Sequence, residues 1–246
     1  MTPAELLSRT ATPLSAPAWS PGPFISYGVE VLNLTYRSDL GALAALVPEP
    51  LKVRDGLVRF QVMRMPDTTG LGDHASASQA VSVEYDGEPG YYLDAMYLDS
   101  TPALLVGRET AGFPKKLGAP RLARDTDTLV GTLDYGSLRV ATATMGYKHF
   151  PLAPGAAREE VTAPLFMVKM TREADGTLAG CQLVRLAVQH VTVTGAWSGP
   201  ARLHLVPHAL APVADLPVMG DTTAHHIACT DLGYGPATVV HDYLAA

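Results

Sequence analysis

The sequence predicts a mainly β protein of the α+β class: a single domain built on a closed, meandering antiparallel β-barrel with a few short helices. Three observations predict it. Alternating or short apolar segments recur along the 246 residues, turn clusters such as Asp86–Gly90 separate them, and the helical crossovers of a parallel sheet are absent. With 47% hydrophobic residues the chain can bury a sizeable core, and β-rich chains of this length are commonly one domain. We expect that domain to span residues 1–246.

Residues 1–24 are expected to form an N-terminal helix and a proline-rich arm. Thr2–Glu5 matches a capping box with proline at the first helical position, which predicts a short helix to about Arg9. From Thr12 to Phe24 the chain must run extended with few ladder hydrogen bonds, because it carries Pro13, Pro17, Pro21 and Pro23. We expect this arm to lie against the barrel or a neighbouring subunit.

The strands follow in order, with one more helix among them. Val29–Tyr36 alternates as a strand, and Asp39–Val47 has helical spacing that Pro48 stops. The other expected strands are Leu57–Arg64, Gln79–Tyr85, Tyr91–Leu98, Ala103–Val106, Thr128–Tyr135, Leu138–Tyr147, Leu165–Thr171, Gln182–Thr194 and Ala201–Val206.

The charge balance favours a small-molecule partner. Charged residues make up only 17% of the chain and the net charge is -6, so a nucleic-acid surface or a basic membrane-binding face is not expected. A mean hydropathy of +0.12 leaves more apolar surface than a small monomer usually exposes. We therefore expect a homo-oligomer.

The compartment expected from the sequence is the cytoplasm. Cys181 and Cys229 are too few for a disulfide framework. No basic segment followed by an apolar one marks an export signal, and no stretch approaches the ~20 apolar residues of a membrane span.

Two adjacent lysines, Lys115 and Lys116, lie in an apolar frame that is closed by glycines and prolines. Because Gly112, Pro114 and Gly118 disfavour a helix or a central strand here, we expect the pair in a constrained loop that leaves the core. A lysine attacks a carbonyl only as the neutral amine, so a nucleophilic lysine needs a pKa lowered by burial or by a nearby cation. The local pattern alone also fits a solvated turn with snorkelling side chains.

Specific motifs surround this pair and continue beyond it: Gly107–Glu109, Pro114–Gly118, Asp127–Gly136 and Leu138–His149. With them the chain resembles the acetoacetate decarboxylase family from Thr12 to Leu244. In that family the first lysine forms a Schiff base with the substrate ketone and the second is its cationic neighbour, so the resemblance assigns these roles to Lys115 and Lys116. It also implies catalysis without a cofactor or metal, a small carbonyl substrate and a homo-oligomer.

The chain departs from the family at three substrate-binding positions. Where the resemblance places an arginine and two glutamates, this sequence has Val29, Gln61 and Ser76. Loss of the arginine should weaken recognition of a free carboxylate. Loss of the glutamates removes proton carriers and charges that orient or repel that carboxylate.

Three further residues are candidates for the substrate pocket. His74 would share a strand face with Ser76 and could replace the missing acid or base, although it could equally be a turn residue near Gly72. Phe113 and Met96 are candidate pocket walls, and ordinary core is the alternative for both.

Other motifs support no second chemistry. The chain has eight histidines, but the only pair at helical metal-ligand spacing, His204 and His208, is broken by Pro207. Gly70–Gly72 lacks the rest of a dinucleotide fingerprint, and Gly195–Gly199 misses the spacing of a nucleophile elbow.

Three functions remain. The first is a Schiff-base lyase of acetoacetate decarboxylase type, in which Lys115 acts on a β-keto acid or a related carbonyl compound. The second keeps the imine but directs it to aldol, dehydration or cyclisation chemistry, because a protonated imine accepts electrons from several bonds. The third is a barrel that binds a ligand without catalysis.

Overall fold

The computed structural model describes residues 1–245, so the last residue of the expected domain, Ala246, lies outside the described residues. In chain order the elements are α1 (Pro3–Leu7), β1 (Ile25–Arg37), α2 (Leu40–Leu46), β2 (Lys52–Thr68), β3 (Gly72–Tyr85), β4 (Glu88–Leu98), α3 (Thr101–Val106), the π-helical turn η1 (Gly107–Ala111), β5 (Lys115–Leu117), β6 (Ala119–Asp125), β7 (Thr128–Tyr135), β8 (Leu138–Gly146), β9 (Phe150–Pro151), α4 (Pro154–Thr162), β10 (Leu165–Arg172), β11 (Leu178–Leu186), β12 (Val188–Gly199), β13 (Ala201–Leu205), the 3-10 turn η2 (Val213–Asp215), β14 (Met219–Tyr234) and β15 (Thr238–Asp242).

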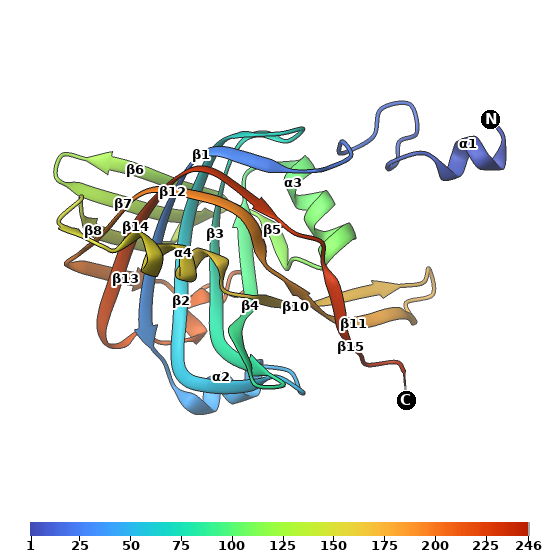
Figure 1. The fold of residues 1–246 in the computed structure, drawn as a ribbon. Helices are drawn as coiled ribbons and strands as arrows, with labels where there is room; N and C mark the ends of the chain where they lie inside the picture. Colours follow the sequence, from blue (N-terminus) through green and yellow to red (C-terminus); the bar gives the residue numbers. More distant parts are fainter. Residues whose placement is uncertain (246) are drawn as a thin grey trace.

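The mainly β class with a few short helices is confirmed, but the closed barrel is wrong (Figure 1). The larger sheet has the order β15-β11-β10-β4-β3-β2-β1-β14-β12-β9, with β5 added beside β4, and the smaller sheet has the order β13-β8-β7-β6. Within residues 1–245 both sheets are open, because the terminal strands of each order do not pair with each other. Strand β6 contacts β2 and β3, so a second sheet, and not closure, covers the apolar face of the larger sheet.

The main core lies between these sheets. Leu32 and Val62 of the larger sheet and Leu129 and Leu133 of the smaller one are fully buried in the same cluster. Gly131 of the smaller sheet lets the two sheets approach closely, since a Cβ at this position would lie only 2.9 Å from Val62 Cγ2 of the larger sheet and would push it away. Interdigitation of this kind is the usual way in which two sheets bury their apolar faces.

The expected strand Ala103–Val106 is a helix, and because of this error the sequence did not predict the connection that leads to the lysines. Ala103–Val106 lies in α3, whose first turn has Ser100 as N-cap accepting from Ala103 N and a proline at the start. After η1 the chain returns as β5, parallel to β4. A helical crossover is therefore present, and the lysines lie on a short strand at the side of the sheet and not in a loop. An apolar run this short does not distinguish a strand from a buried helix.

The N-terminal helix is confirmed with its capping box, although it ends at Leu7. Figure 1 shows α1 projecting from the body, whereas the following arm returns to it. Trp19 Nε1 donates to Glu109 Oε2 at 2.8 Å, and Ser20 Oγ donates to Gly70 O at 3.2 Å. The arm thus reaches the protein beside η1.

Several elements were not expected from the sequence. These are β6, α4, β14 and β15, and the predicted strand Gln182–Thr194 is divided between β11 and β12. Strand β14 pairs with β1 on one side and β12 on the other, so it is central to the larger sheet. None of the helices in residues 1–245 combines the length and the apolar character that crossing a membrane requires.

Candidate active site

Lys115 projects from β5 toward α3. Its Nζ donates to Ala103 O at 2.8 Å and lies 4.7 Å from the centre of the Phe113 ring. Gly107 leaves the room that the amine occupies, because a Cβ there would overlap Nζ and lie 2.8 Å from Cε. The turn of π-helix that begins at this glycine therefore shapes the position of the amine, and such turns often occur at functional sites.

The amine faces a cavity of about 420 Å³ whose walls are mostly apolar. Of the residues predicted from the sequence, the cavity brings together Gln61, His74, Ser76, Met96, Phe113 and Lys115. Among the described residues, no arginine, aspartate or glutamate lines this cavity, and Lys115 is its one primary amine. A smaller hollow that shares Gln61, Met96 and Phe113 with it is lined by Arg59 and Glu160. The arrangement suits an uncharged group or a ligand whose charge is balanced by the lysine itself.

Burial lowers the pKa of Lys115 to about 8. Water would stabilise the ammonium form more than the apolar wall does, so the neutral amine is favoured relative to an exposed lysine. A substantial share of nucleophilic amine is therefore present close to neutral pH.

Lys116 has different surroundings. Its Nζ donates to Leu210 O and lies 5.0 Å from the centre of the Tyr135 ring, and the residue is exposed. It does not line the cavity, because successive residues of a strand face opposite sides. The lowered pKa of Lys115 thus follows from burial, and the structure does not bring the expected cationic neighbour into the site.

Val29 does not line the cavity. It is fully buried in a core cluster with Val31, Met63 and Ile227 on the larger sheet, and Met63 of this cluster lines the cavity. The position that the resemblance aligns with an arginine is thus a buried apolar residue packed in the same cluster as part of the cavity wall.

His74 and Ser76 lie on β3 with their side chains at the cavity wall, and His74 is only 7% exposed. His74 Nδ1 donates to Gly72 O at 3.3 Å, since a carbonyl oxygen can only accept. Burial lowers the pKa of His74, and the positive charge of Lys115 lowers it further, although the Gly72 carbonyl opposes both. The ring is therefore neutral around pH 7, with Nε2 left as the acceptor.

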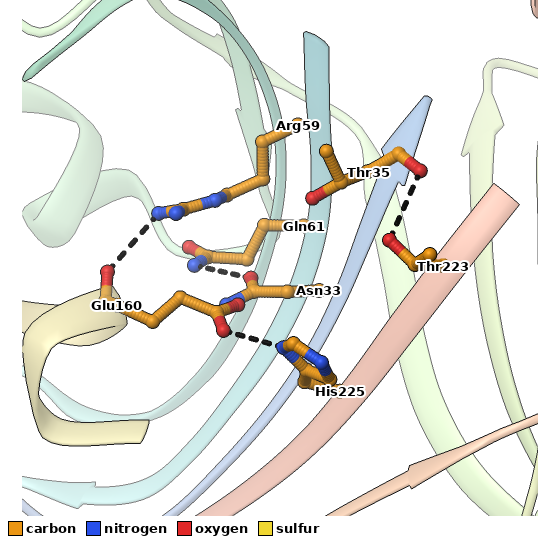
Figure 2. Close-up of polar contacts among 7 residues, drawn as sticks. All are labelled: Asn33, Thr35, Arg59, Gln61, Glu160, Thr223 and His225. Carbon is orange, nitrogen blue, oxygen red and sulfur yellow. Dashed lines mark hydrogen bonds and ion pairs between the residues drawn. The ribbon is translucent and has the colours of Figure 1, made fainter. Parts of the chain in front are cut away.

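A continuous row of paired residues crosses the larger sheet and ends at Lys115. The pairs are His225↔Asn33, Asn33↔Gln61, Gln61↔Ser78, Ser78↔Met96 and Met96↔Lys115. Residues paired in this way share a sheet face. Along one face of the sheet, the row thus connects the cavity, through Gln61, with the polar groups of Asn33 on β1 and His225 on β14 (Figure 2).

Comparison with known proteins shows the family of the chain. The family model "Acetoacetate decarboxylase (ADC)" matches residues 11–244. The chain belongs to the acetoacetate decarboxylase family. It is 56% identical over 241 residues to acetoacetate decarboxylase of Streptomyces nogalater, with 98% of each chain covered.

Two more acetoacetate decarboxylases show the same similarity along the whole chain. The protein of that name from Clostridium beijerinckii is 51% identical over 242 residues, covering 98% of each chain. A solved structure of acetoacetate decarboxylase superposes with a TM-score of 0.97 at 47% identity, covering 99% of this chain and 100% of the other.

Relative to the acetoacetate decarboxylase pattern quoted above, the structure adds residues that the sequence did not single out. Trp19 of the arm, together with Leu186, Leu232 and Tyr234, completes the cavity wall. The Tyr234 ring meets the Phe113 ring edge-on, with 5.9 Å between centroids. Most of these residues come from β11, β14 and the loops beside them, where no motif marked a site.

Proposed function

We propose that this chain is a Schiff-base-forming carbon–carbon lyase that decarboxylates acetoacetate or a related β-keto acid, with Lys115 as the nucleophile. The observation that carries the proposal is the amine of Lys115 at the wall of an apolar cavity, with a pKa lowered by burial to about 8. Similarity to acetoacetate decarboxylases along the whole chain supports it.

Besides the substrate, the chemistry uses only Lys115, water and a proton. Neutral Lys115 Nζ attacks the ketone carbon, and loss of water gives a protonated imine. The bond to the carboxylate then breaks, and its electron pair passes to the imine nitrogen, which gives carbon dioxide and an enamine. The enamine carbon takes a proton, and water hydrolyses the resulting imine. Acetoacetate and one proton thus yield acetone and carbon dioxide, and the lysine is regenerated.

His74 is the proposed proton carrier for the enamine step. It lines the same cavity as Lys115, and burial keeps its ring neutral near pH 7. A neutral imidazole with a free acceptor nitrogen can relay a proton from water. Gln61 and Ser76 are proposed to contact the substrate, with Met96 and Phe113 as apolar walls.

One observation favours a second function, in which the imine is formed but not decarboxylated. The described wall of the cavity beside Lys115 carries no arginine, and Arg59 lines the smaller adjoining hollow instead, so a neutral ketone or aldehyde meets less desolvation cost next to the amine. Aldol, dehydration or cyclisation chemistry would then follow the same imine.

Borohydride trapping together with carbon dioxide release tests these functions. The protein is incubated with acetoacetate or with a neutral ketone, reduced and mapped by peptide mass. We expect an adduct on Lys115 and carbon dioxide from acetoacetate. An adduct without carbon dioxide would support the second function, in which the imine is formed but not decarboxylated. If no adduct forms with any carbonyl compound, both functions fail and a ligand-binding protein remains.

We also propose that the chain is one domain, a homo-oligomer and a cytoplasmic protein. Large exposed side chains support the oligomer: Leu6, Leu7, Leu40, Leu117, Leu138, Phe150, Met170 and Leu210. The free cysteines, Cys181 and Cys229, are compatible with a reducing compartment. Light scattering after size-exclusion chromatography measures the mass of the assembly, and a monomer would contradict that part.

A further inference from the structure

A chain of hydrogen bonds runs from the cavity wall to a charged pair beyond it (Figure 2). Gln61 Nε2 donates to Asn33 Oδ1 at 2.8 Å, and Asn33 Nδ2 donates to Glu160 Oε1 at 2.6 Å. The other carboxylate oxygen of Glu160 is 2.6 Å from His225 Nδ1. The mechanism proposed above uses none of Asn33, Glu160 or His225.

Glu160 is held as a carboxylate. Burial alone would raise the pKa of Glu160, but the His225 hydrogen bond and the nearby Arg59 charge outweigh it and lower that pKa. Arg59 also donates to Glu160 O at 3.2 Å from β2. A carboxylate can only accept hydrogen bonds, so the charge on Glu160 fixes what its neighbours must donate.

The charge determines the orientation of two carboxamides in sequence. Asn33 must turn its NH2 group to Glu160 and therefore its oxygen to Gln61. Gln61 must then turn its NH2 group to Asn33, as Figure 2 shows. The remaining oxygen of Gln61 is the group left for the cavity that this residue lines.

We propose that Glu160, held by His225 and acting through Asn33, is a positioning residue that keeps the carboxamide of Gln61 with its oxygen toward the substrate and its NH2 group away from it. At this wall the cavity then meets the carboxamide of Gln61 at its oxygen, a hydrogen-bond acceptor, while the NH2 group is directed to Asn33. Gln61 would accept a hydrogen bond from a donor group of the bound ligand, and it would not hold the substrate carboxylate.

The orientation has a chemical consequence that depends on the proposed decarboxylation. Negative charge leaves the carboxylate as carbon dioxide forms, so a donor on that carboxylate would stabilise the bound substrate more than the transition state. Withholding the NH2 group of Gln61 therefore weakens substrate binding and raises the rate of bond cleavage. The row of pairs from Gln61 to Lys115 places this wall on the sheet face that carries the amine.

The test replaces Glu160 by Gln, which leaves the size of the side chain but adds donors, so that both carboxamides can reverse. Glu159→Gln is the matched control, because Glu159 is the exposed neighbour on the same helix and its change removes the same charge. Binding is measured as protection of Lys115 from an acylating reagent by levulinate, a stable keto carboxylate, and by the neutral ketone 2-pentanone.

We expect Glu160→Gln to bind levulinate about tenfold more tightly, since a hydrogen bond to a carboxylate is gained, with 2-pentanone little changed. For acetoacetate, KM and kcat should both fall. Glu159→Gln should match the unmodified protein in all of these. Equal shifts for levulinate and 2-pentanone, or the same shift in the control, would overturn the proposal.

Two more variants keep the test decisive. If Glu160→Gln does not fold, Asn33→Ala interrupts the chain without touching the charged pair and should produce the same contrast between ligands. The double variant Gln61→Glu with Glu160→Gln exchanges the positions of carboxylate and carboxamide, which reverses the donor and acceptor in both hydrogen bonds of Asn33. This double variant should recover the thermal stability that is lost in Gln61→Glu alone. Failure of that recovery would contradict the hydrogen-bond directions. Absence of carbon dioxide from the unmodified protein would overturn the proposed function, whereas the ligand contrast tests the orientation separately.

Discussion

Lys115 and Lys116 are adjacent in the sequence, yet only the first meets the cavity. The strand alternation that turns Lys115 inward turns Lys116 toward Leu210 O and the Tyr135 ring. The sequence could predict that one lysine is the nucleophile. It also indicated that burial would lower the pKa of Lys115 at least as much as the second lysine does. It could not predict that burial is the whole cause, because the surroundings of each amine depend on packing.

Replacing each lysine by arginine separates their contributions. Lys115→Arg should abolish borohydride trapping and lower kcat by at least about 10³-fold, because guanidinium stays charged and cannot act as the nucleophile. Lys116→Arg should retain most activity, since its side chain is exposed and lies outside the cavity. Peptide mapping after trapping checks both. An adduct in the Lys115 variant would place the chemistry on another residue.

The pH dependence of acylation reports the burial of the amine directly. Only neutral lysine reacts, so the rate at Lys115 should rise with pH and level off above about 8, where its pKa lies. Exposed lysines should keep rising to about pH 10. Because the pKa is lowered, the reactive fraction at pH 7 exceeds that of exposed lysines. Mass spectrometry of acylated peptides from pH 6 to 10 measures this, and a profile shared by all lysines would refute it.

At the level of elements, the unit β4, α3, η1 and β5 places the nucleophile. The class and most strands of the larger sheet follow from alternation, but this unit does not, since the helix Thr101–Val106 has too few residues to show a period. Strand β14 was also missed. It is a central strand with polar residues such as His225 and His226 among apolar ones, so neither alternation nor a continuous apolar run marks it. His225 of the network was missed together with this strand, and Glu160 was missed because α4 was not expected.

Gly107 offers a test of this unit that separates position from stability. In Gly107→Ala the new Cβ would overlap Lys115 Nζ and displace it, while the backbone at φ -65 accepts alanine and helix propensity improves. We expect imine formation to fall about tenfold or more with unchanged or higher Tm. Gly155→Ala in α4 is the control, since open space surrounds that position. Equal imine formation in both variants would show that Gly107 does not set the position of the amine.

At the scale of the whole molecule, the sequence could least predict that the larger sheet stays open and does not close into a barrel. Short antiparallel connections suggest a meander, but they do not say whether its ends meet or whether another sheet covers its face. Here the smaller sheet covers it, through close approaches such as Gly131 to Val62. The polar network around Gln61 lies on the other face of the larger sheet, because Asn33 and Gln61 alternate along their strands with residues of the core between the sheets. Its members come from α4, β1, β2 and β14, which no local sequence pattern brings together.

The stability of the whole protein should depend on pH through this network. The Glu160 hydrogen bond raises the pKa of His225, so the stabilisation from protonated His225 is full below about 6.5 and is lost as pH rises through the folded value. The lowered pKa of Glu160 adds stability above about pH 4.3, and this stability is lost as pH falls through the pKa of Glu160 in the folded protein.

The Tm gap between the unmodified protein and Glu160→Gln should therefore be widest near pH 5–6 and narrow toward pH 9. Because His225 is 32% exposed, screening limits the pair to about 1 kcal/mol, or about 2–4 °C. Calorimetry over this range measures the gap. A gap that stays constant, or that widens with pH, would contradict the titration of Glu160 and His225 as a pair and would assign the contribution of Glu160 to its contacts with Asn33 and Arg59.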